Sequence, residues 1–230
     1  MRKYLLLPLL MLVTVHAGGA EKIPGQKPLL LIGDKFQFIP GSWAAYRIED
    51  KVKSESYRMY IAVLDKDKKQ KPPASWMEIV VESRGNPAVV TRLLAQETPQ
   101  GPGKMLKVIV QVAGYSPFNV PKKYFQGKGA EVAPTVPAQI IKRLEKRTFM
   151  AGKRQVEGWE VEAEDAKGSR TRGVVSEEVL PIGVLEAETD DVKMSLEDWG
   201  MDARTRIQGT PRAFSLWILE QIAKEISKTQ

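Results

Sequence analysis

The residues of this chain best suited to chemistry are its carboxylates. Glycoside hydrolysis needs only two acidic side chains that face each other across a cleft. The candidate acids are Glu78, Glu160, Glu177, Glu178, Glu186 and Glu188. Their spacing selects no two of them, and alternate acids such as Glu160 and Glu162 are typical of the solvated face of a strand. No catalytic residue is therefore assigned, and an acid-pair glycan hydrolase is the third hypothesis.

Most metal sites, and much acid–base chemistry near neutral pH, depend on histidine or cysteine. The chain contains no cysteine and one histidine, His16, which lies in a stretch that we expect to be removed. A Ser-His-Asp triad is then excluded. A calcium loop beginning at Asp65 also fails, because Gln70 and Trp76 stand where glycine and glutamate are required. We predict a protein that is not an enzyme and has no metal site or cofactor.

Residues 1–20 predict an export signal. A basic start at Arg2 and Lys3 precedes an apolar run from Tyr4 to Val15 and small residues up to Ala20, which is the order of a secretory signal. The apolar run is too short to favour the alternative, an uncleaved membrane anchor. We expect an exported protein, periplasmic if its source has an outer membrane and secreted otherwise. Residues 21–230 are expected to form a single β-rich domain.

Period-two alternation of apolar residues dominates the chain and predicts strands with one buried face. The alternating segments are Tyr57–Leu64, Trp76–Ser83, Lys104–Val112, Glu157–Ala163 and Val192–Trp199. Turn sequences such as Gly85–Pro87 separate the strands, which favours antiparallel hairpins over parallel units. The prediction is a mainly β (α+β) fold: a curved antiparallel sheet or half-open β-barrel of about eight to eleven strands, with covering helices.

Two segments depart from this alternation. Residues 114–149 are predicted to be an insertion, in which a loop rich in proline and glycine, Gly114–Pro137, precedes a helix over Ala138–Phe149. The helix would place Ile140, Ile141, Leu144 and Thr148 opposite the basic Lys142, Arg143, Lys146 and Arg147. Such a helix suits transient contact with an anionic membrane surface, or simple packing on the sheet with its charges in water.

A second helix is predicted after Pro211. Its apolar stripe consists of Phe214, Trp217, Ile218, Ile222 and Ile226, and we expect this C-terminal helix to plug or cover the sheet. The formal net charge of the whole chain is +7, with both signs interleaved along the sequence. That pattern is typical of a solvated surface, and no motif indicates a nucleic-acid partner.

Methionines recur on the apolar faces of the predicted strands. Flexible thioethers there could adapt to varied acyl chains, although core packing explains the same positions. The residues predicted to bind a ligand are Met59, Met77, Met105, Met194, Tyr57, Trp159, Tyr115 and Phe118.

Three segments resemble a known superfamily. Ser176–Thr189 with Val192–Gly200 is similar to the late strand pair of the periplasmic lipoprotein carriers, and Pro40–Ile48 is similar to an opening strand there. In that superfamily an incomplete antiparallel barrel closed by helices holds lipid acyl chains. The resemblance implies such a fold and a lipid or lipoprotein ligand, but it transfers no binding residue.

The leading hypothesis is thus a non-enzymatic exported protein that binds a lipid, lipoprotein or other apolar ligand in the concave face of its sheet. The second hypothesis is an envelope module with a filled core that docks a protein partner. Its sequence support is the aromatic group Tyr115, Phe118, Tyr124 and Phe125.

Overall fold

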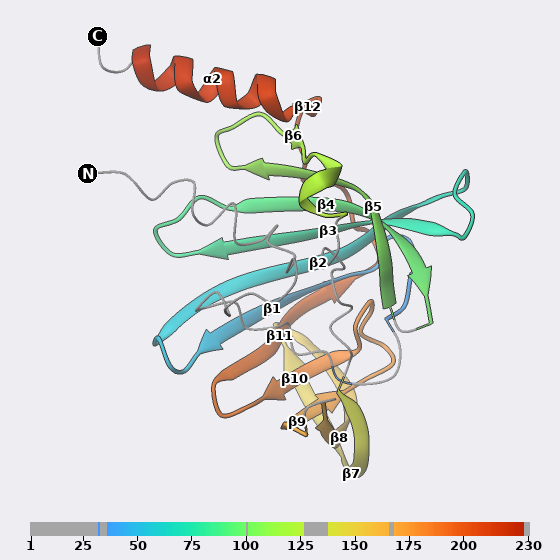
Figure 1. Ribbon diagram of the computed structural model, residues 1–230. Coiled ribbons are helices and arrows are strands. Elements are labelled where there is room, and N and C mark those ends of the chain that lie inside the picture. Colours follow the sequence, from blue (N-terminus) through green and yellow to red (C-terminus); the bar gives the residue numbers. More distant parts are fainter. Residues whose placement is uncertain (1–31, 33–35, 100, 127–137, 166–167, 228–230) are drawn as a thin grey trace.

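The computed structural model describes residues 32, 36–99, 101–126, 138–165 and 168–227. Within these residues the chain forms one sheet of twelve strands and one α-helix, close to the C-terminus (Figure 1). The expectation of a mainly β fold built on an antiparallel sheet is confirmed. The sheet is open, with β12 and β7 at its two edges. The predicted signal, residues 1–20, lies outside the described residues.

The sheet consists of two meanders joined side by side. Its strands are β1 (Trp43–Asp50), β2 (Glu55–Asp67), β3 (Ala74–Ser83), β4 (Val89–Thr98), β5 (Gly101–Val112), β6 (Phe118–Asn119), β7 (Gln139–Ala151), β8 (Arg154–Glu164), β9 (Arg170–Val175), β10 (Val184–Glu188), β11 (Val192–Gly200) and β12 (Arg212–Ala213). Their order is β12-β6-β5-β4-β3-β2-β1-β11-β10-β9-β8-β7. The pairing of β1 with β11 joins the meanders, and only the pairing of β12 with β6 is parallel. The count exceeds the expected range because β6 and β12 have two residues each.

All five segments with an alternating sequence are strands, and they fall within β2, β3, β5, β8 and β11. Alternating apolar residues such as Met59 in β2 and Met194 in β11 lie on one face of the sheet, which we call the inner face and which also carries Tyr46. In β2 and β3 the opposite face is apolar as well, and its residues form a separate buried cluster. Met194 pairs with Ile48 on β1 and with Ala187 on β10, and all three are buried. The alternation therefore predicted the direction of these side chains correctly.

The predicted helix over Ala138–Phe149 is wrong, because Gln139–Ala151 forms the edge strand β7 and pairs with β8. The basic residues of this segment meet acids of β8. Lys146 Nζ lies 2.7 Å from a Glu157 carboxylate oxygen, and an Arg147 guanidinium nitrogen lies 3.7 Å from Glu160. Two register shifts interrupt β7, and such bulges break the period of two, so the apolar residues fall at nearly helical spacing.

The outer face of β2, β3 and β4 is covered by residues 201–211, which we call the outer strap. Glu78 on β3 is completely buried beneath it and accepts hydrogen bonds from Thr205 Oγ1 at 2.7 Å and from the Arg206 backbone N–H at 2.8 Å. The Arg206 guanidinium lies 4.0 Å from the centre of the Tyr60 ring. The outer strap carries the chain from β11 to β6, where β12 pairs.

The helix predicted after Pro211 is confirmed as α2, Phe214–Ser227. Its Trp217 ring centre lies 4.4 Å from that of Phe118 on β6, so the helix is attached at one edge of the sheet and extends beyond it (Figure 1). The inner face is instead packed with side chains that include Phe36 and Phe38. No helix among the described residues combines the length and apolar character needed to cross a bilayer.

Candidate functional site

The four predicted methionines lie on the inner face but belong to its packed core. Met59, Met77 and Met194 are 7%, 3% and 1% exposed, and Met105 is partly buried. Met59 and Met194 belong to one apolar cluster, whereas Met77 and Met105 belong to another. The structure therefore does not bring the four together around one opening.

Three predicted aromatic residues also take part in packing. Tyr57 packs against the cluster of Met59 and Met194, and burial, followed by the charge of Asp50, raises the pKa of its phenol. Phe118 is buried against Trp217. Phe125 is buried in the same cluster, so the aromatic loop that supports the partner-docking hypothesis contributes much of its apolar surface to the core.

Tyr115 borders an opening away from the inner-face core. This pocket, of about 650 Å³, lies between residues 111–117 and 208–212, and its lining is mostly backbone and polar side chains. Within the described part of the chain, Tyr115 is the one predicted ligand residue that lines this pocket.

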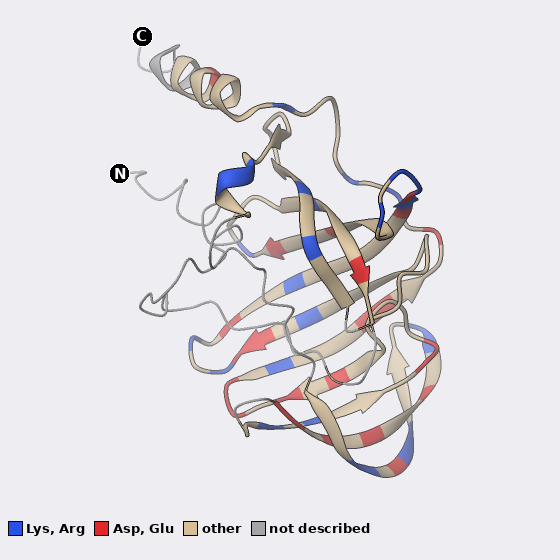
Figure 2. Cartoon of the chain, turned by 45° about the vertical axis from the view of Figure 1, so that its right-hand side comes forward, with Lys and Arg blue, Asp and Glu red and all other residues tan. Residues whose placement is uncertain are grey.

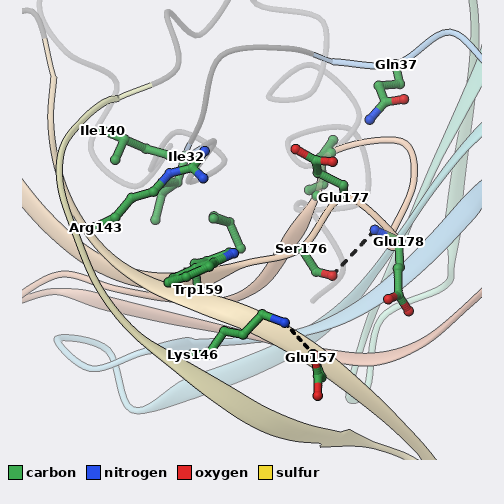
Figure 3. Close-up of a pocket in the computed structure, with 13 residues that line it drawn as sticks. Ile32, Gln37, Ile140, Arg143, Lys146, Glu157, Trp159, Ser176, Glu177 and Glu178 are labelled. Carbon is green, nitrogen blue, oxygen red and sulfur yellow. Dashed lines mark hydrogen bonds and ion pairs between the residues drawn. The ribbon is translucent and has the colours of Figure 1, made fainter.

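Trp159 borders a different pocket, of about 540 Å³, on the inner face of β7 and β8. We call it the β7–β8 pocket. Its apolar lining consists of Trp159, Ile32, Ile140, Val175 and Ile182, and its charged lining consists of Arg143, Lys146, Glu157, Glu177 and Glu178 (Figure 3). Trp159 is 38% exposed, so a large indole surface is open to a ligand, as is common in small-molecule sites.

Local features of the sequence shape this pocket. Gly173 on β9 has no side chain, and a Cβ there would lie 2.7 Å from the Glu186 carbonyl oxygen and would also press against Ile32 Cδ1, so the glycine leaves room for Ile32 to pack on the sheet. The Gln37 backbone N–H donates a hydrogen bond of 2.9 Å to the Pro181 carbonyl. This bond ties the segment before β1 to the loop of residues 176–183, which supplies Glu177 and Glu178.

Apart from Glu157, which is paired with Lys146, charges of opposite sign lie on different sides of the pocket. Figure 3 shows Arg143 and Lys146 on one side, and Glu177 and Glu178 on the other. Lys146 Nζ lies 6.0 Å from the centre of the Trp159 ring. Arg143 is exposed and forms no ion pair within the described part of the chain. A cation beside an exposed indole suits a ligand with an anionic group attached to an apolar body.

The contact between Lys146 and Glu157 keeps both groups charged. The hydrogen bond that Lys146 donates lowers the pKa of the Glu157 carboxyl, and the same bond raises the pKa of Lys146. A carboxyl whose pKa is lowered by folding stabilises the fold at neutral pH, and that contribution is lost as the pH falls through the lowered pKa.

Replacing Lys146 with methionine is therefore expected to raise the pKa of Glu157 toward the ordinary value for glutamate. A pH titration of the glutamate carboxyl carbons by NMR measures this change. Lys142→Met on the same strand is the control, because its Cα partner on β8 is Glu162. If Glu157 titrated at the same pH in both variants, the ion pair would not exist in solution.

The remaining candidate acids have structural partners. Glu160 faces Arg147, and Glu186 lies 3.7 Å from Lys193. Glu188 accepts a hydrogen bond of 2.6 Å from Lys51, which lowers the pKa of its carboxyl. Of the six acids, only Glu177 and Glu178 line the β7–β8 pocket. The described residues contain no group of three or more acids and histidines placed to hold a metal ion.

Sequence reasoning identified Trp159 and the basic residues of β7, but it did not place them together. Arg143 and Lys146 are on the inner face with Trp159, whereas the Cα partner of Lys142 is Glu162 on the outer face. The acids of β8 were a usable signal, because a basic segment that pairs with an acidic strand satisfies cross-strand charge preferences. Nothing in the sequence indicated Ile32 or Ile182.

No model of a known protein family matches the chain, and no curated protein matches its sequence. The resemblance to the periplasmic lipoprotein carriers stays a prediction.

Proposed function

We propose that this protein is a non-enzymatic binding protein that holds a lipid-like, amphipathic ligand in the β7–β8 pocket. The observation that carries the proposal is the exposed Trp159 ring beside the charged Lys146 and Arg143, and Arg143 has no ion-pair partner among the described residues. An apolar chain would lie on Trp159 and Ile140, and an anionic group would contact Arg143. The ligand class includes free lipids and the acyl part of a lipoprotein.

This proposal keeps the ligand on the inner face but places it at β7 and β8, away from the methionines expected to bind it. The centre of the inner face is occupied by core side chains, so an acyl chain there would have to displace them. Among the described residues nothing fills the β7–β8 pocket, and its volume is within the usual range for small-molecule sites. Export to the periplasm or the medium, which residues 1–20 predict, would place the protein among such ligands.

Native mass spectrometry of the protein purified from its source is the first test. A mass above that of the denatured chain, released by organic solvent, is the expected result. Binding of a fluorescent fatty acid supplies the second readout. Trp159→Ala is expected to weaken that binding about tenfold or more, since losing contact with an indole costs at least about 1.5 kcal/mol.

Arg143 and Lys142 form a matched pair for the charge contribution. Arg143→Glu is expected to weaken binding of the fatty acid, whereas Lys142→Glu should not, because Lys142 does not line the pocket. The proposal fails if the purified protein carries no extra mass and the probe does not bind. Equal effects of the two charge reversals would indicate a general surface effect instead of a site.

A glycan hydrolase is the second candidate, because Glu157, Glu177 and Glu178 all line the same pocket. The pKa of Glu157 is lowered by Lys146, which is opposite to the raised pKa that a general acid requires. This observation favours binding over hydrolysis. Turnover of an envelope glycan that disappears in Glu177→Gln or Glu178→Gln would instead favour the hydrolase over the binding protein.

A further inference from the structure

The helix α2 presents an apolar face that nothing in the described part of the chain covers. Leu216, Leu219 and Ile222 are 59%, 61% and 51% exposed, and Ile218 is 37% exposed. Between residues 214 and 223 the only charged side chain is that of Glu220, which is held by Arg212 at 2.6 Å. Four large aliphatic side chains exposed on one helix call for a partner that removes them from water.

The opposite side of α2 fixes how this face is presented. Trp217 is buried, its ring 4.4 Å from Phe118, and the Phe214 ring lies 5.9 Å from that of Tyr124. These contacts attach the first turns of the helix to β6 and to the 3₁₀ turn η1 (Lys122–Tyr124). The face with Leu219 therefore has a set position at the end of the molecule, where α2 extends beyond the sheet (Figures 1 and 2).

Positive charge lies next to this apolar face. Lys122 and Lys123 in η1 are exposed, and they precede Tyr124, whose ring contacts that of Phe214 at the start of α2. Lys123 Nζ lies 5.0 Å from the centre of the Tyr124 ring, which is 46% exposed. Aliphatic side chains bordered by lysine and tyrosine are the composition of helices that lie in the interface of an anionic bilayer.

We propose that α2 and η1 together dock the protein on an anionic membrane surface, with Leu216, Leu219 and Ile222 inserted among the lipids and Lys122 and Lys123 against the headgroups. The charge complementarity of the two lysines favours a bilayer over a second copy of the chain, which would bring like charges together. This inference does not rest on the β7–β8 pocket. It also differs from the membrane contact expected of Lys142, Arg143, Lys146 and Arg147, whose segment is a strand.

The absence of cysteine in the chain allows a specific test. Leu219→Cys in the full chain, labelled with an environment-sensitive dye, is mixed with vesicles of 70% phosphatidylcholine and 30% phosphatidylglycerol. A blue shift and a rise in emission are expected. Met150→Cys is the matched control, because Met150 is 58% exposed but lies on β7; its label should stay in water.

The lysines are tested by Lys122→Gln combined with Lys123→Gln. Vesicle partitioning of the Leu219→Cys label should fall about 30-fold, at about 1 kcal/mol for each basic residue near an anionic surface. No shift of the Leu219 label on anionic vesicles overturns the proposal, even if the protein sediments with them. A shift that appears without vesicles and grows with protein concentration also overturns it, and would identify a second copy as the occupant.

Discussion

Replacing Met194 with alanine is expected to lower the free energy of unfolding by about 3 kcal/mol, because truncating a buried methionine removes apolar contacts and leaves a cavity. Met194 is 1% exposed and occupies the centre of the sheet, with Ile48 and Ala187 as its cross-strand partners. A close-packed core collapses only partly around such a gap. Urea denaturation of the two proteins measures the difference.

Met150→Ala is the control, because Met150 is 58% exposed on β7 and its truncation should change the stability by less than about 0.5 kcal/mol. The comparison also bears on the function. If Met194→Ala cost as little as Met150→Ala, the inner face would already be open at Met194. The ligand site would then lie at the centre of the sheet, among the methionines, and not in the β7–β8 pocket.

Strands with regular alternation of apolar and polar residues could be predicted from the sequence, because the period of two reflects one buried face and one solvent-exposed face. In β11, Val192, Met194 and Leu196 are buried, while Lys193 and Ser195 between them are partly exposed. The same contrast holds in β8 beyond Trp159, whereas the middle of β2 is buried on both faces. Alternation of this kind is fixed by the pleat of the strand and does not depend on the rest of the chain.

The strand β7 could not be predicted in this way. It is an edge strand with mostly exposed side chains on both faces, so no buried face imposes an apolar period. Two register shifts, after Ile140 and after Arg143, add further irregularity. The lysines and arginines that suggested a helix face are typical of exposed edge strands, where charge discourages pairing with other chains.

The candidate site was predictable only in part. Trp159 was predicted as a ligand residue on the apolar side of an alternating strand, and Arg143 and Lys146 were noted for their charge. The proximity of these three residues depends on the pairing of β7 with β8. The packing of Ile32 against β9 depends on the small size of Gly173. Such contacts join residues far apart in sequence, and no local pattern records them.

The outer strap was also beyond sequence reasoning, since residues 201–211 have no periodicity of their own. Its consequence is that Glu78, which has the position of a residue on a solvated face, is completely buried. A buried carboxylate must have hydrogen-bond donors, and here the donors come from Thr205 and Arg206. An acid that appeared to be a catalytic candidate is a structural anchor.

Replacing Glu78 with alanine is expected to lower the free energy of unfolding by about 3 kcal/mol, since a hydrogen bond to a charged group contributes about 1.5 kcal/mol and two are lost. The substitution also leaves the Thr205 hydroxyl and the Arg206 N–H without their acceptor. Thermal or urea unfolding measures the loss. Exchange of the Arg206 amide hydrogen should accelerate as well, because that amide is protected by the Glu78 carboxylate.

Glu82→Ala isolates the effect of burial. Glu82 is on the same strand and lies 3.6 Å from the Arg206 guanidinium, but its side chain is 44% exposed, so its loss should cost less than about 1 kcal/mol. Equal, small losses for the two variants would mean that Glu78 does not hold the outer strap. The position of α2 would then depend on the pairing of β12 with β6 and on the contacts of Trp217 and Phe214 with the sheet edge. A large loss for Glu78→Ala alone would make the buried carboxylate part of what presents the apolar face of α2.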